Sequence, residues 1–187
     1  CCIMKPMPIP LVKLKALLLY FAQYTNPRYL GIVKLMKLIY FADFLHVKKY
    51  ALPITYDRYI NLDKGPIPSD ILNTINSSMA EGENSKLIDS IIIKREAGID
   101  KKSIIPAREI TQQDLDLFSQ TELEILENVV NRFGNSTTNE IIEASHSESP
   151  WIRTIYRQEI PYELAALDKD AEVSAEEIIF ATGTVAV

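Results

Sequence analysis

The sequence predicts one domain of the α+β class, predominantly helical around a buried central helix, with a small antiparallel sheet of about three strands. Three observations lead to this prediction. Hydrophobic residues recur at helical spacing in several segments, β-branched runs of strand length stand between them, and the strand–helix–strand alternation of parallel α/β folds is missing. With 187 residues, 47% of them hydrophobic, the chain can bury a substantial core. We expect the domain to span residues 8–187, after a short N-terminal tail over residues 1–7.

The stretch Lys34–His46 predicts the central helix. Hydrophobic side chains occupy most of its circumference, and neither Gly nor Pro interrupts it. A helix of this kind is normally covered by other elements on every side. Two starts fit the sequence: Asn26-Pro27, as an N-cap followed by a first helical residue, and Gly31 about a turn later. The helix is expected to end near Lys49, because lysines suit the negative end of the helix dipole.

The rest of the first half predicts short helices and strands on either side of the central helix. Leucines at helical spacing predict a helix over residues 11–24. Residues 54–62 are rich in Ile, Thr and Tyr and predict a strand. Residues 63–68 contain one Gly and two Pro and therefore predict a rigid turn. A short helix is expected to follow over residues 70–79.

The middle of the chain predicts a β-hairpin. Residues 87–94 are β-branched and apolar, residues 97–100 suit a turn, and residues 103–107 suit the returning strand. Together with residues 54–62, these two strands are expected to form the antiparallel sheet. The sheet would then pack with one face on the helices.

Three capping-box sequences mark the starts of helices in the second half. They begin at Ser119, Thr137 and Ser174. The first helix should stop at Gly134, because glycine is the usual residue after a helix end. The second should break at residues 146–151, and the third should be short and reach about Phe180.

Composition argues against several classes of function. The net charge of −5 disfavours a nucleic-acid partner, because a binder of nucleic acid needs a basic footprint. No apolar run reaches the roughly 18–20 residues that span a bilayer, so we expect no membrane partner. The only two cysteines are adjacent at the start of the chain, which fits a reducing cytoplasm. No phosphate-cradling Gly-rich loop or nucleophile elbow is present, and we expect neither a catalytic residue nor a cofactor.

One pattern offers an enzyme as the alternative. Asp43 and His46 stand three residues apart, as do Glu143 and His146, so each pair can share one helix face. Di-iron bundles use Glu-x-x-His pairs of this kind, which makes a metal-dependent enzyme the alternative function. The sequence supplies no further ligand on an adjacent helical face. We therefore expect each His to be hydrogen-bonded in or near the core, and no metal site.

A partner-binding surface has two candidates. The first is an arc of the central helix, and the second is the only Trp, a residue type that is enriched at interaction hot spots. The candidate residues are Lys34, Lys37, Phe41, Phe44, Lys48 and Trp151. Each candidate also has a structural interpretation. The lysine stems of the arc would lie over the aromatic rings with their ammonium groups in water, and the Trp would anchor the core.

Specific motifs run through much of the chain. The first half has Lys34-Leu35-x-Lys37-Leu38-Ile39-Tyr40-Phe41-Ala42-Asp43, then His46 and Tyr50, then Pro53-Ile54-Thr55, then Gly65-Pro66-Ile67-Pro68. The second half has Ser145-His146, Pro150-Trp151, Thr154 and Ile160-Pro161. Over residues 10–167 these motifs resemble the Panacea domain of the SocA-like antitoxins, a phage-associated protein family. The chain departs from the family pattern at Ala51, where Gly is frequent, and at Asp63-Lys64, where an aromatic residue often precedes the Gly-Pro turn.

The resemblance implies a fold and a function. The fold would be mostly helical with a small sheet, in a cytoplasmic bacterial or prophage protein. The protein would neutralise a cognate protein toxin encoded beside it, by direct binding. Sequestration of the toxin and its delivery to a proteolytic machinery are both open as routes. The resemblance supplies no catalytic residue, so we expect an antitoxin rather than an enzyme.

Overall fold

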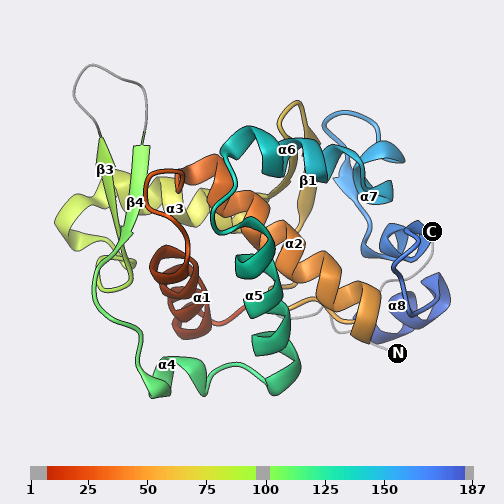
Figure 1. The fold of residues 1–187 in the computed structure, drawn as a ribbon, viewed down its shortest axis with the longest axis horizontal. Helices are drawn as coiled ribbons and strands as arrows, with labels where there is room; N and C mark the ends of the chain where they lie inside the picture. The colour runs from red at the N-terminus through yellow and green to blue at the C-terminus, as the bar shows by residue number, and fades with distance from the viewer. Residues whose placement is uncertain (1–7, 96–101, 184–187) are drawn as a thin grey trace.

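The computed structural model describes residues 8–95 and 102–183. Helix α2 (Ile32–Tyr50) crosses the middle of the molecule, and the other elements surround it (Figure 1). It starts after Gly31, the second of the two predicted starts. Side chains all around its circumference are buried, as the prediction of a central helix requires. The predicted tail at residues 1–7 and the predicted turn at residues 97–100 lie outside the described residues.

The longer of the remaining helices follow the sequence patterns. The remaining helices are α1 (Leu11–Tyr24), α3 (Ser69–Glu81), α4 (Gln112–Leu115), α5 (Gln120–Phe133), α6 (Thr138–His146), α7 (Ser149–Ile152) and α8 (Ala175–Thr182), with 3₁₀ turns η1 (Gly82–Asn84) and η2 (Tyr162–Leu167). All three predicted capping boxes form with both reciprocal hydrogen bonds, before α5, α6 and α8. The short helices α4 and α7 and the turn η2 had no recognised sequence pattern.

The strands within residues 8–95 and 102–183 form two antiparallel sheets instead of one. Strands β1 (Tyr59–Leu62), β2 (Gly65–Pro68) and β5 (Glu159–Ile160) form a sheet in the order β2-β1-β5. Strands β3 (Ile91–Arg95) and β4 (Lys102–Pro106) form a separate hairpin on another side of the molecule (Figure 1). The α+β class and the three-stranded antiparallel sheet are confirmed. The expectation that the hairpin belongs to that sheet is wrong.

Two local predictions are corrected around β1. The strand expected over residues 54–62 begins only at Tyr59. In the residues that precede Tyr59, backbone N–H groups donate hydrogen bonds to the carboxylate of Asp43 and not to a neighbouring strand. Its Oδ1 accepts from Ile54 at 2.7 Å and from Thr55 at 2.8 Å. The turn expected over residues 63–68 becomes strand β2 from Gly65 onward. Prolines are tolerated in β2 because it is an edge strand.

No helix within the described ranges 8–95 and 102–183 is both long enough and apolar enough to cross a membrane. The described core is instead built around α2, with α1 and α5 packed on it. This arrangement leaves the β3–β4 hairpin and the C-terminal end of α3 together at one end of the molecule (Figure 1).

Candidate functional site

The structure buries five of the six side chains that the sequence proposed for partner binding. The exposed fractions are 0% for Lys34, Lys37, Phe41 and Phe44, and 2% for Lys48. In this fold the arc is buried, so its lysine ammonium groups lie inside the protein and the interpretation that placed them in water is wrong. A role for these five residues in partner binding stays a prediction.

Two of the buried lysines bind backbone carbonyl groups. The ammonium group of Lys34 donates to the carbonyls of Gly134 and Ser136, beyond the end of α5. That of Lys37 donates to the carbonyl of Pro66 in β2. Burial lowers the pKa of Lys34 to about 8 and that of Lys37 to about 7. Both side chains therefore connect α2 to neighbouring elements.

Lys48 lies among three carboxylates. Its Nζ is 3.0 Å from Glu148, 3.0 Å from Asp168 and 3.1 Å from Asp170. Burial by itself lowers the pKa of Lys48, but the attraction of these carboxylates outweighs it and the pKa is raised. The cluster ties the C-terminal end of α2 to the segments around α7 and η2.

The aromatic members of the arc also have structural roles. The ring of Phe41 lies against Phe133 of α5, with the ring centroids 4.4 Å apart. The ring of Phe44 lies 5.2 Å from Tyr59 of β1 and 5.2 Å from Tyr162 of η2. These contacts hold α5, the three-stranded sheet and the C-terminal segment on α2.

Trp151 is the one candidate that keeps some contact with solvent. Its ring stacks on His146, with the ring centroids 4.0 Å apart, and its Nε1–H donates to the carbonyl of Leu62 at 3.3 Å. Exposed hydrophobic side chains follow it, with Ile155 at 69%. Trp151 therefore anchors α7 on β1, and its contact with a partner stays a prediction.

The two acid–histidine pairs do not come together as a set of metal ligands. Asp43 also accepts from the hydroxyl of Tyr59 at 2.8 Å, and its pKa is raised to about 6 because burial outweighs its hydrogen bonds. His46 contacts the carbonyl of Leu52 through Nδ1 and Thr121 through Nε2. Among residues 8–95 and 102–183, no group of three or more His, Cys, Asp or Glu is placed to hold a metal ion.

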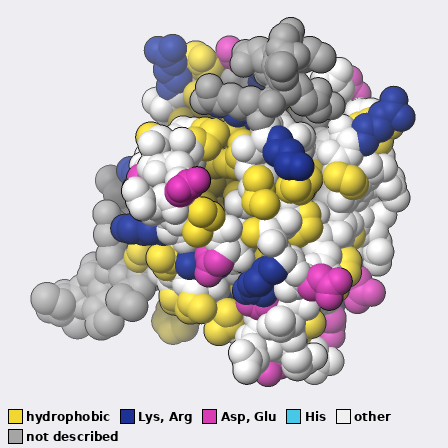
Figure 2. Space-filling view, turned by 90° about the vertical axis from the view of Figure 1, so that its left-hand side faces the viewer, with side chains coloured by type: hydrophobic (Ala, Val, Ile, Leu, Met, Phe, Trp, Pro, Cys, Tyr) yellow, Lys and Arg dark blue, Asp and Glu magenta, His cyan; other side chains and the backbone are white. Residues whose placement is uncertain are grey.

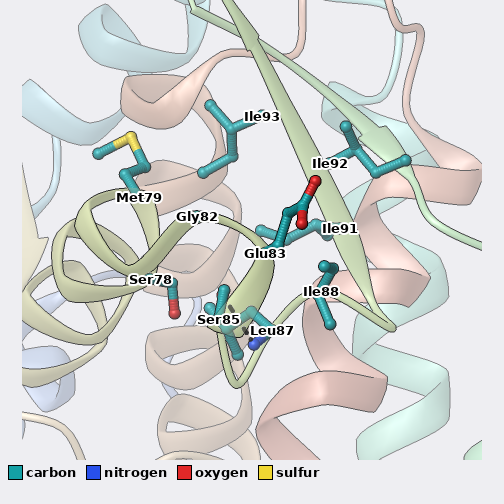
Figure 3. Close-up of a pocket in the computed structure, with 10 residues that line it drawn as sticks. All are labelled: Ser78, Met79, Gly82, Glu83, Ser85, Leu87, Ile88, Ile91, Ile92 and Ile93. Atoms are coloured by element: carbon teal, nitrogen blue, oxygen red, sulfur yellow. Dashed lines mark hydrogen bonds between the residues drawn. The ribbon is translucent and has the colours of Figure 1, made fainter.

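The described surface carries an apolar groove that the sequence interpretation missed. It has a volume of about 580 Å³ and lies between the C-terminal end of α3, the turn η1 and strand β3 (Figure 3). Its apolar lining consists of Met79, Leu87, Ile88, Ile91, Ile92 and Ile93. Hydrophobic side chains gather on this side of the molecule in Figure 2.

The groove has a buried floor and exposed walls. Leu87 and Ile91 are buried, whereas Ile88 is 50% exposed and Ile92 is 42% exposed. Glu83 is the one charged side chain among the described lining residues. The signal in the sequence was the run of three isoleucines in β3. Successive side chains of a strand point to opposite faces, so such a run in a two-stranded hairpin leaves at least one of them uncovered.

A second, smaller hollow lies beside the N-terminal end of α5. It has a volume of about 370 Å³, and His46, Lys13 and Glu122 are among its lining residues. Lys13 and Glu122 form an ion pair at 2.7 Å, and the ring nitrogens of His46 are already hydrogen-bonded. Its polar groups are thus engaged with one another, and the apolar groove offers more surface to a partner.

Comparison with known proteins gives one finding. The family model described as "Antitoxin SocA-like, Panacea domain" matches residues 35–152, which is more than half of the chain. The matched residues run from α2 through α7 and include both the β3–β4 hairpin and the groove beside it. Neither the curated proteins nor the solved structures gave a significant match.

Proposed function

We infer, since this chain belongs to the SocA-like antitoxin family of the Panacea domain, that it neutralises a cognate protein toxin by direct contact. The family match is the observation that carries this proposal. A toxin–antitoxin pair encoded by neighbouring genes is its expected setting. The net charge of −5 supports a protein partner with a basic surface, because opposite charge speeds encounter between partners.

The arrangement of polar groups supports binding over catalysis. Within the described part of the chain, the buried ionisable side chains of α2 are engaged by internal partners: Asp43 by backbone N–H groups, and Lys48 by carboxylates. These contacts stabilise the fold. The alternative of a metal-dependent enzyme that uses Asp43 with His46 and Glu143 with His146 gains no support from this geometry.

A rescue experiment tests the proposal. The chain is expressed in a bacterial host together with the product of the gene beside it, under separate inducible promoters. Rescue of growth, together with co-purification of the two proteins, is the expected result. If the folded wild-type chain neither restores growth nor co-purifies with that product, the antitoxin proposal fails.

The same cells distinguish the two routes of neutralisation. Protein synthesis is blocked and the amount of toxin is followed over time. A toxin lifetime that the antitoxin leaves unchanged supports sequestration. A shortened lifetime, restored in hosts that lack individual proteases, supports delivery to a proteolytic machinery.

A further inference from the structure

We propose that the toxin binds by adding an extended segment to the open edge of β3, with its side chains in the groove between β3 and α3. This inference rests on the proposed antitoxin function and names the surface and the kind of contact. Addition of a strand to a sheet edge is a general mode of peptide recognition. Backbone hydrogen bonds supply the affinity in this mode, and the pockets for alternate side chains supply the specificity.

The hydrogen-bond pattern of the hairpin shows which backbone groups are free. Along an antiparallel pair of strands, directly opposite residues alternate between two kinds. In one kind their backbone N–H and C=O groups bond to each other, and in the other these groups point away from the partner strand. The N–H of Ala107 donates to Ser90 at 3.0 Å, whereas the N–H of Ile104 points away from β3 and donates to Leu30 at 2.9 Å. Ile93 is paired with Ile104, so its own N–H and C=O also point away from the ladder. They face the open edge of β3.

The two edges of the hairpin differ. The outer edge of β4 is covered by the chain itself, through the bond from Ile104 to Leu30 and a bridge between Gly31 and Ser103. The outer edge of β3 has no strand partner among residues 8–95 and 102–183. On this edge the N–H of Ile91 donates to the carbonyl of Leu87 at 3.1 Å, so the outward groups of Ile93 are the ones that can act as a template for another strand.

The groove follows this open edge. Three consecutive residues of β3 line it, although successive side chains alternate between the faces of a strand. A hollow on one face of β3 would be lined by every second residue of the strand. Because consecutive residues line this one, it runs along the outer edge of β3. Ile93 of β3 and Met79 of α3 stand on its opposite sides (Figure 3). A strand placed there would meet free backbone groups on one side and an apolar wall on the other.

The chemistry of the groove defines its occupant. Its lining is mostly apolar, so the bound segment must carry apolar side chains at alternate positions. The exposed carboxylate of Glu83 calls for a Lys or Arg near one end of that segment. The expected occupant is therefore an extended stretch of the toxin with alternating apolar residues and a nearby cation.

A set of groove variants tests the inference against matched controls. Ile88→Asp and Glu83→Lys change the groove, and Leu167→Asp and Glu159→Lys make equivalent changes of charge at exposed positions outside it. Binding to the purified product of the neighbouring gene is measured by calorimetry. Each groove variant should weaken binding by at least about tenfold, which corresponds to about 1.4 kcal/mol. The two controls should keep the wild-type Kd.

A backbone variant tests the strand contact directly. Ile93→Pro removes an outward N–H that does not bond to β4, and proline is tolerated at such edge positions. It should weaken toxin binding by at least about tenfold while circular dichroism and the melting temperature stay close to wild type. Where this variant melts early, amide hydrogen exchange of the wild-type chain gives the same information. The Ile93 amide should become protected when toxin is added, whereas the Ile104 amide is bonded to Leu30 in both states.

The outcomes separate this inference from the proposed function. If the wild-type chain binds the toxin, and the groove variants bind as tightly as it does, the edge of β3 is not the docking site and the antitoxin function stands. In the chain without toxin, the Ile93 amide could become more protected as the protein concentration rises. That result would show that a second copy of this chain pairs with the edge of β3, and it would also overturn the inference. If the wild-type chain binds no toxin, both proposals fall.

Discussion

The ammonium group of Lys48 lies 3.0 Å from the carboxylate of Glu148, and both side chains are buried. One residue belongs to the central helix and the other immediately precedes α7, one hundred residues later in the chain. Asp168 and Asp170 complete the cluster. This contact fastens the C-terminal third of the chain to α2, and a role for Lys48 in partner binding stays a prediction.

Loss of the Lys48 charge should destabilise the fold. In Lys48→Met the carboxylate of Glu148 stays buried but loses its nearest cation. Breaking a buried ion pair in this way lowers the free energy of unfolding by about 3–5 kcal/mol. Lys49→Met is the matched control, because its side chain is exposed and its effect should stay within about 0.5 kcal/mol. Urea unfolding monitored by circular dichroism measures both. Equal midpoints for the two variants would contradict the structural role of the cluster.

Lys37 should make stability depend on pH. Burial lowers its pKa from 10.5 to about 7 in the folded chain. Between these two values the unfolded chain binds more protons at this lysine than the folded chain, so its contribution to the free energy of unfolding rises with pH across that window. Lys37→Met should reduce the rise in stability expected for wild type between about pH 7 and about pH 9.5, and Lys49→Met should not. A Lys37→Met variant with the full wild-type rise would show that this lysine keeps an ordinary pKa.

Gly65 should tolerate no side chain. Its φ is +88°, and an added Cβ would lie 2.4 Å from the hydroxyl oxygen of Ser145 and 3.0 Å from Cε of Lys37. Gly82 also has a positive φ, of +58°, but an added Cβ there meets nothing within 4 Å. Gly82→Ala should therefore show only the cost of its rarely populated backbone conformation, about 1–3 kcal/mol, and Gly65→Ala should cost more by about 1–3 kcal/mol of overpacking. Equal melting temperatures in the two variants would refute the close contact at Gly65.

The sequence predicts the parts of the fold that local patterns determine. Helix α2 could be recognised because its hydrophobic residues surround the helix axis, and the helices after Ser119, Thr137 and Ser174 because each capping box lies within four residues. Strand β2 was missed because prolines are acceptable only at a sheet edge, and the sequence does not show which strand is the edge.

The candidate sites depend on partners that are distant in sequence. Lysines are rarely buried, so the sequence predicts solvent-exposed positions for Lys34 and Lys37. Their acceptors are the carbonyls of Gly134 and Pro66, which any residue could supply and no sequence pattern marks. The groove was missed for a similar reason. The isoleucines of β3 predict a strand, but which edge of the hairpin stays open depends on segments distant in sequence: Leu30 and Gly31 cover β4, and no described strand pairs with the outer edge of β3.

A calorimetric titration of the purified chain with the purified product of its neighbouring gene tests toxin binding most directly. The expected result is saturable binding with a Kd below about 1 μM, together with rescue of growth when the two are co-expressed. Absence of binding heat at concentrations of about 50 μM, with no shared peak in size-exclusion chromatography, would contradict neutralisation by direct contact.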